Sequence, residues 1–147
     1  MGDNSRSGYE LLLLRRAAHR TLPGVWQPVT GGIEGRETAW QAAGREVREE
    51  TGLNPRRWWA LDAPTLIYEP ARDTLVVLPL FAAELGDDDT PRLSSEHDRM
   101  AFVSPALARR RVHWISQRHA ILALERQHFT ARRRRAPEPA TRSRRMH

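Results

Sequence analysis

Residues 31–53 read GGIEGRETAWQAAGREVREETGL, and this stretch contains the most informative pattern in the chain. Thr38 is followed three residues later by Gln41, which is the pattern of a helix N-terminal capping box. Good helix-forming residues come next, and Gly52 lies where a helix C-terminal cap glycine belongs. The pattern therefore predicts a helix over residues 39–51.

Three glutamates fall on one face of this predicted helix. Because a helix turns by about 100° per residue, Glu46, Glu49 and Glu50 lie within an arc of about 100°. Carboxylates this close repel one another, and a divalent cation such as Mg²⁺ or Mn²⁺, which prefers oxygen ligands, would remove the repulsion. The alternative is a solvated acidic face that Arg45 and Arg48 balance.

The spacing of the whole stretch favours the metal site. It resembles the signature of the Nudix family, G-x5-E-x7-R-E-U-x-E-E-x-G-U, in which U is a bulky aliphatic residue. Every fixed position of that signature is filled, by Gly31, Glu37, Arg45, Glu46, Val47, Glu49, Glu50, Gly52 and Leu53. Nine matches over 23 residues make the resemblance highly specific.

The resemblance implies a metal-dependent hydrolase. Glu49 and Glu50 would be the core ligands of Mg²⁺ or Mn²⁺, and Glu46 a further ligand or the base that activates water. Gly31 would let a backbone carbonyl approach the metal without a side-chain clash. Water would then attack phosphorus in a diphosphate linkage, giving a monophosphate plus phosphate or diphosphate, with stabilisation that is mainly electrostatic.

The resemblance also implies the fold and three structural residues. Glu37 and Arg45 would hold the helix on its loop, and Gly52 would end the helix. The expected fold is an α/β (α+β) sandwich, with a mixed β-sheet between the signature helix and a C-terminal helix. The family usually begins one strand earlier than residue 9, so the first edge strand is expected to be missing or to lie upstream of Met1.

Segments outside the signature point to a subgroup. Trp26-Gln-Pro-Val-Thr-Gly, Ser94-Ser-Glu-His and Trp114-x5-Ala-Ile are similar to the subgroup typified by dihydroneopterin triphosphate diphosphatase. The resemblance implies a pterin triphosphate or a nucleoside triphosphate as substrate. Two rivals stay open: a silent Nudix-fold binding module, and an enzyme for a sugar or isoprenoid diphosphate. The three intact glutamates of the signature favour an enzyme.

Several residues outside the signature are candidates for the site. Glu96 would be an extra ligand or base, whereas His97 is expected to be a surface or capping residue. Arg15 and Arg16 end the first strand, and we expect one of them to clamp phosphate while the other faces water. Trp26 and Tyr68 offer flat faces for a base or pterin ring, although such residues more often belong to the core.

Composition limits the remaining possibilities. The chain of 147 residues has no cysteine and its 24 basic residues are all arginine, so thiolate and lysine chemistry are excluded. Residues 131–147 hold seven of the arginines and one of the 18 acidic residues, which leaves 17 of each sign in residues 1–130. The net charge of +6 therefore belongs to the tail and does not by itself indicate nucleic-acid binding.

We expect the chain to divide into a flexible segment at 1–8, a Nudix domain at 9–130 and a disordered arginine- and proline-rich tail at 131–147. Strands are expected at 9–16, 26–30, 58–68 with a bend at Pro64, 73–85 and 100–103, and helices from 104 and at 115–128. No segment resembles a signal peptide or a membrane span, so we expect a cytoplasmic protein with a small-molecule substrate. Tail binding to nucleic acid and homodimerisation are both compatible with the sequence.

Overall fold

The structure, a computed structural model, describes residues 8–129. Expectations for residues 1–7 and 130–147 lie outside the described residues. The helices and strands, in chain order, are β1 (Leu11–Arg16), β2 (Trp26–Gln27), α1 (Ala39–Thr51), β3 (Arg57–Ala60), β4 (Thr65–Glu69), a 3₁₀ turn (Pro70–Arg72), β5 (Thr74–Leu78), β6 (Phe81–Glu84), β7 (His97–Val103), α2 (Pro105–Arg111) and α3 (Ile115–Phe129).

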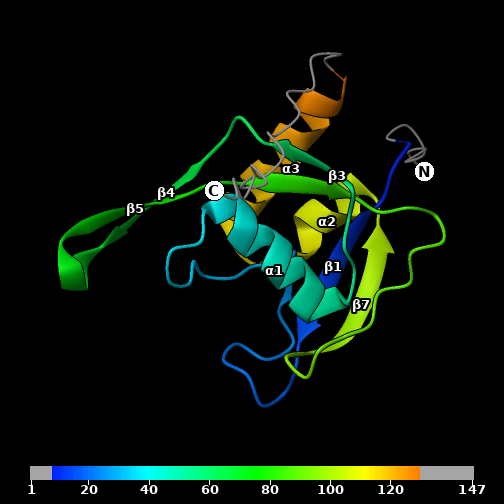
Figure 1. Cartoon of the computed structure of the whole chain (residues 1–147), viewed down its shortest axis with the longest axis horizontal. Coiled ribbons are helices and arrows are strands. Elements are labelled where there is room, and N and C mark those ends of the chain that lie inside the picture. The colour runs from blue at the N-terminus through cyan, green and yellow to red at the C-terminus, as the bar shows by residue number, and fades with distance from the viewer. Residues whose placement is uncertain (1–7, 130–147) are drawn as a thin grey trace, which may run out of the picture.

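The strands form three antiparallel ladders. One has the order β2-β1-β7, the second pairs β3 with β6, and the third pairs β4 with β5. A single parallel bridge joins Trp26 to Val112. α1 lies on one side of the strands while α2 and α3 lie on the other, as Figure 1 shows. The α+β sandwich expected from the sequence is confirmed, and no strand precedes β1 within the described residues.

The core lies between the β1–β7 pair and the two C-terminal helices. Its buried side chains are Leu13, Val103, Ala108, Val112 and Ile121. Leu14 points to the other face of β1 and is also fully buried. The Leu11–Leu14 run therefore forms a strand that is covered on both faces, as the sequence predicts.

α1 contacts the strands through an aromatic cluster. The ring of Trp40 lies edge-on to Trp58 at 5.2 Å and to Phe81 at 5.3 Å, measured between ring centroids. These rings come from β3 and β6, so the contact fixes the N-terminal half of the helix against that ladder. Nearer its C-terminus the helix buries Glu50 and Thr51.

Prolines divide two of the expected strands. The 58–68 strand breaks at Pro64 into β3 and β4, and the 73–85 strand breaks at Pro79 into β5 and β6. Proline has no N–H to donate to a ladder, so each break falls where pairing must stop. Because of these breaks, β4 and β5 form a separate hairpin that projects from the body (Figure 1).

β7 is longer than expected. It starts at His97 instead of residue 100, because pairing with β1 continues to Arg16 across an irregularity in register. β2 is shorter than the expected 26–30 strand and keeps only Trp26 and Gln27. Within residues 8–129, none of the helices has the length and apolar character that a membrane span requires.

Candidate active site

Both ends of α1 are fixed by the caps that the sequence predicts. The Thr38 side chain accepts from the Gln41 N–H at 3.2 Å, and the Gln41 side chain accepts from the Thr38 N–H at 2.8 Å. At the other end Gly52 has a φ of 71°, and its N–H donates to the Arg48 carbonyl at 2.8 Å. A left-handed cap of this kind favours glycine. The glutamates of the helix are therefore held on a well-defined backbone.

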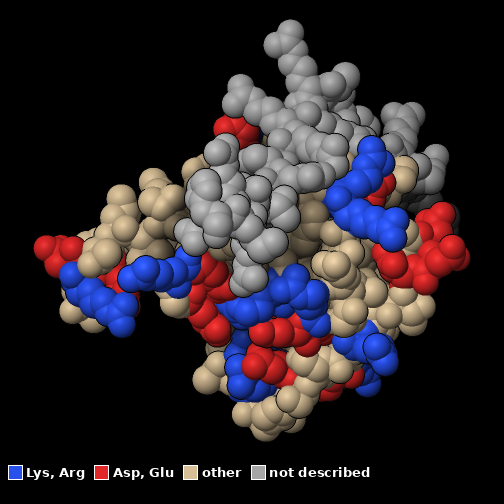
Figure 2. Space-filling model, viewed as in Figure 1, with Lys and Arg blue, Asp and Glu red and all other residues tan. Residues whose placement is uncertain are grey.

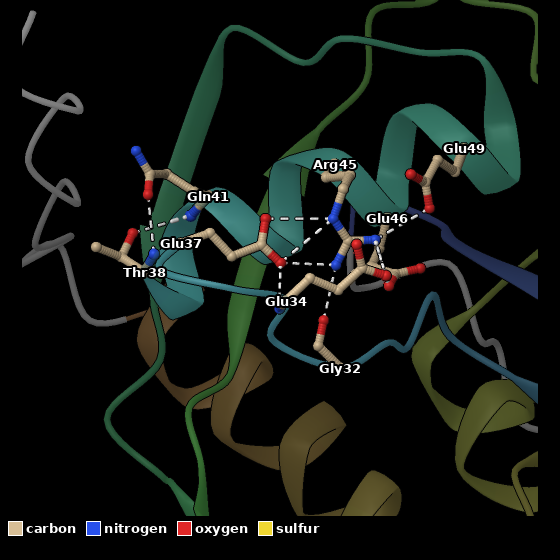
Figure 3. Close-up of polar contacts among 8 residues, drawn as sticks. All are labelled: Gly32, Glu34, Glu37, Thr38, Gln41, Arg45, Glu46 and Glu49. Carbon is tan, nitrogen blue, oxygen red and sulfur yellow. Dashed lines mark hydrogen bonds and ion pairs between the residues drawn. The ribbon is translucent and has the colours of Figure 1, made fainter.

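Arg45 is the centre of the polar contacts around these glutamates (Figure 3). Its Nη1 donates to Glu46 Oε1 at 2.8 Å and to Glu49 Oε2 at 3.0 Å. Its Nη2 donates to Glu37 Oε1 at 2.8 Å and to the Gly32 carbonyl at 2.7 Å. These bonds from Arg45 hold the pKa of the Glu37 carboxyl below its usual range. One guanidinium thus joins the helix, its acidic face and the preceding loop.

The acidic side chains of the helix are not gathered around one centre. Among residues 8–129, no group of three or more His, Cys, Asp or Glu side chains has the arrangement of a metal site. Acidic and basic side chains alternate on the face that bears α1, as Figure 2 shows. Arg45 donates to one oxygen of Glu46 and to one oxygen of Glu49. A carboxylate has two oxygens, so each keeps one with which to bind a cation.

Glu50 points inward. Its residue is 5% exposed, and its Oε2 is buried without a hydrogen-bond partner. Burial, followed by the negative charges of Glu46 and Glu96, raises the pKa of Glu50 from 4.5 to about 8. A buried carboxylate oxygen without a donor is costly unless it is protonated or meets a cation. The chemistry of these oxygen donors therefore suits a hard divalent cation, although the described acidic side chains do not converge on one point in this structure.

Gly31 lies directly against Glu46. A Cβ added at Gly31 would lie 1.9 Å from the Glu46 Cδ and 2.0 Å from its Oε1. A Cβ at Gly32 would meet nothing within 4 Å. The loop therefore requires glycine at position 31, because the Glu46 carboxylate comes close to the backbone there.

Glu96 approaches the same region from the segment before β7. The Ser94 N–H donates to the Glu50 carbonyl at 3.4 Å, and the Ala17 N–H donates to the Glu96 carbonyl at 2.9 Å. The Glu96 side chain pairs with Arg20, with 3.2 Å between Nη2 and Oε2. Its negative charge contributes to the raised pKa of Glu50. The structure thus brings Glu96 and Glu50 into electrostatic reach of each other.

The two strand-end arginines have different surroundings. Arg15 forms a two-pronged pair with Asp98, at 2.7 Å from Nε and 2.9 Å from Nη2. Arg16 donates from Nη2 to the Thr21 hydroxyl at 2.8 Å. The positive charge of Arg16 acts to lower the pKa of Glu50, whereas the Arg15 guanidinium is paired with Asp98. Arg16 is thus the one of the two that lies near the glutamates.

The structure separates the two aromatic candidates from each other. The Trp26 ring packs beside the core cluster, and Arg111 covers it at 5.2 Å from guanidinium carbon to ring centroid. Tyr68 lies on the projecting β4–β5 hairpin, 58% exposed, where its hydroxyl bonds to Asp73 at 2.8 Å. β4 points away from the body that carries α1 (Figure 1).

Two neighbours of the site were not found from the sequence. His97, expected at the surface or in a cap, is 5% exposed, and its Nε2 lies 3.4 Å from Nε2 of the buried Gln27. The expectation was wrong because β7 starts earlier than predicted. Burial lowers the pKa of His97, and its Nδ1 has no hydrogen-bond partner. Arg20 was also missed, since its pairing with Glu96 depends on loop geometry.

Comparisons with known proteins identify the family of this chain. The family model described as the NUDIX domain matches residues 3–124. An octanoyltransferase from Myxococcus xanthus is 35% identical over an alignment of 112 residues, and the match covers 69% of this chain. The chain spans only 28% of the length of that protein.

Solved structures are similar over most of the chain. A protein from Listeria monocytogenes described as a Nudix hydrolase is 27% identical, with 84% of this chain and 86% of that chain covered and a TM-score of 0.70. The E. coli dihydroneopterin triphosphate pyrophosphohydrolase is 26% identical, with 76% and 82% covered and a TM-score of 0.64. A C. elegans Ap4A hydrolase shares the fold at 23% identity, with 80% and 84% covered and a TM-score of 0.64. The chain therefore belongs to the Nudix family.

Proposed function

We propose that this enzyme hydrolyses a diphosphate linkage in a nucleoside or pterin di- or triphosphate, with Mg²⁺ or Mn²⁺ held by Glu46, Glu49 and Glu50. The products would be the monophosphate and either phosphate or diphosphate. The similarity to the E. coli pterin enzyme supports the pterin or nucleoside triphosphate class. The signature itself handles only the diphosphate, so the attached group must be identified by assay.

The observation that carries the proposal is the buried Glu50 carboxylate. Its Oε2 has no donor, and burial, together with three further carboxylates, raises its pKa. A cation-binding role explains why such a group is kept inside a folded domain, because a bound cation compensates both burial and repulsion. When bound, the cation would neutralise diphosphate oxygens and lower the pKa of the attacking water.

Several residues of the chain would bind the cation or position the groups that do. Glu50, and the oxygens of Glu46 and Glu49 that face away from Arg45, would bind the cation. The backbone carbonyl of Gly31 would add a ligand from the loop. Arg45 would position the acidic face without touching substrate, since its donors are engaged with three carboxylates and the loop.

Proton transfer and phosphate binding need further groups. Glu96 would act as an extra ligand or as the base, because it lies in electrostatic reach of Glu50. Glu46 is the other candidate base. Arg16 would contact a substrate phosphate, since its charge acts on Glu50 while Arg15 is occupied by Asp98.

A substrate panel tests the proposal. The full chain is incubated with nucleoside di- and triphosphates, a pterin triphosphate, a sugar nucleotide and an isoprenoid diphosphate, with Mg²⁺, with Mn²⁺ or with a chelator. We expect release of phosphate or diphosphate from nucleoside or pterin substrates, and none with chelator. Turnover confined to the isoprenoid or sugar compounds would move the enzyme to another substrate class. Turnover that the chelator leaves unchanged would contradict the metal site.

A matched pair of variants tests the acidic face. Glu49→Gln should lower kcat by about 100-fold or more, since it removes a proposed ligand. Glu84→Gln is the control, because Glu84 is also a partly exposed glutamate paired with one arginine, Arg57. If both variants give a folded circular dichroism spectrum and are equally active, Glu49 is not a ligand of the cation.

A further inference from the structure

The β4–β5 hairpin exposes one face that consists of three aliphatic side chains and a tyrosine ring. In the register of this ladder Leu66 is opposite Val77 and Tyr68 is opposite Leu75, so these four side chains share a face. They are 60%, 55%, 58% and 59% exposed. We call this set the hairpin face. The opposite face is better covered, because Ile67 is 45% exposed and Val76 is half-buried.

The hairpin receives little support from the rest of the described chain. Its ladder has two strands, and neither β4 nor β5 pairs with another strand among residues 8–129. Figure 1 shows both strands extending away from the helices. A two-stranded hairpin alone is marginally stable in water, and three or more strands or a packed face are needed for stability. An arm of this kind is therefore expected to pack against something.

Charge on the hairpin is restricted to its outer end. Between residues 63 and 80 the charged residues are Glu69, Arg72 and Asp73, all at or next to the turn. Glu69 pairs with Arg72 at 3.7 Å, and Asp73 accepts from the Tyr68 hydroxyl at 2.8 Å. In Figure 2 uncharged side chains cover the upper edge of the arm. The hairpin face thus has no group that would select a charged partner.

We propose that the hairpin face binds the same face of a second copy of this chain. An uncharged apolar face is its own complement, which a twofold-symmetric contact requires. If the two arms run antiparallel, the charged tips lie at opposite ends of the contact and do not repel. That arrangement also places Leu66 of one copy against the second copy's Tyr68, and Val77 against its Leu75.

The area of the hairpin face determines how strongly the two copies are expected to associate. A stable interface buries about 800 Å² per partner, and four partly exposed side chains supply only part of that area. We therefore expect a reversible dimer with a dissociation constant in the micromolar range. This interface lies on the arm and not at the α1 glutamates, so hydrolysis by each copy should not require it.

Sedimentation velocity across a concentration series tests the proposal. The 16.9 kDa chain should sediment as a monomer at low concentration and approach twice that mass as concentration rises. Leu75→Glu should raise the dissociation constant by at least tenfold. Thr74→Glu, next in the chain but on the opposite face, should leave it within about twofold. A wild-type chain that stays monomeric into the hundreds of micromolar, or Leu75→Glu that dimerises as the wild type does, would overturn the proposal.

Cross-linking gives a second readout that does not depend on a disruptive charge. The chain has no cysteine, so one introduced cysteine is unique. Val77→Cys with a short bis-maleimide reagent should give a covalent dimer, while Thr74→Cys should give several-fold less. Equal yields from both faces would contradict a contact through the hairpin face.

Discussion

Replacing Glu50 by glutamine should remove a pH dependence of stability that the wild-type protein has in the absence of divalent cations. The Glu50 carboxyl has a pKa of about 8 in the folded state, raised from 4.5 chiefly by burial. A carboxyl of this kind binds its proton more tightly when the chain is folded. Its contribution to stability is therefore complete below pH 4.5 and is lost as the pH rises toward 8.

The size of the effect follows from these two pKa values. For a single site with pKa values of 4.5 and about 8, the free energy of unfolding falls by about 3 kcal/mol between pH 5.5 and pH 8. Neighbouring carboxylates titrate together with Glu50, so this figure is an upper bound. Glutamine has no proton to release and should not show this loss.

Urea denaturation with a chelator, at pH 5.5, 6.5, 7.2 and 8, measures the difference. We expect the stability of Glu50→Gln relative to wild type to increase steadily with pH, by up to about 3 kcal/mol. The buried His97, whose pKa is lowered, is present in both proteins and cancels in the comparison. Parallel pH profiles for the two proteins would refute the idea that Glu50 is a desolvated carboxylate.

Adding Mg²⁺ or Mn²⁺ at pH 8 extends the same experiment. A cation that binds the folded state alone stabilises it by RT ln(1 + [cation]/Kd), which is about 2.7 kcal/mol at a concentration of 100 Kd. The wild type should gain stability and Glu50→Gln should gain much less. Equal gains would show that the cation binds elsewhere.

Three further predictions concern the loop, the core and the cap. Gly31→Ala should lower kcat by about 100-fold, because its Cβ would overlap Glu46 and displace the carboxylate, whereas Gly32→Ala meets open space and should stay within about twofold in a steady-state assay. Leu14→Ala should lower the free energy of unfolding by about 2–5 kcal/mol in urea, because Leu14 is fully buried; a smaller loss would mean that the site collapses around the cavity. Thr38→Ala should cost about 1 kcal/mol by removing the helix cap, and an unchanged unfolding midpoint would contradict that role.

The helix that carries the glutamates could be predicted from the sequence because its signals are local. Thr38, Gln41 and Gly52 lie within one turn of the ends that they define, and the observed helix has the predicted bounds. The continuous leucine run of β1 is equally local. Features of this kind depend on spacing along the chain, which the sequence contains directly.

Contacts between distant segments could not be predicted in the same way. Arg15 and Asp98 are 83 residues apart, and their pairing follows from the register between β1 and β7. Glu49 and Glu50 are neighbours on the helix, yet one is exposed and the other buried, because the helix docks on one side only. The prolines at 64 and 79 did carry a signal for the broken strands, since proline cannot donate to a ladder.

The guanidinium of Arg45 anchors a loop that has no regular secondary structure. Residues 28–38 have no strand or helix, and Arg45 ties the carbonyl of Gly32 to the helix while it holds two carboxylates on the acidic face. A lysine there would offer a single point of charge and could not span loop and face together. A change in the charge of Glu46 or Glu49 should therefore move the Arg45 guanidinium and, through its bond to the Gly32 carbonyl, the loop. Amide hydrogen exchange of residues 28–38 should therefore change when the charge on the acidic face of the helix changes.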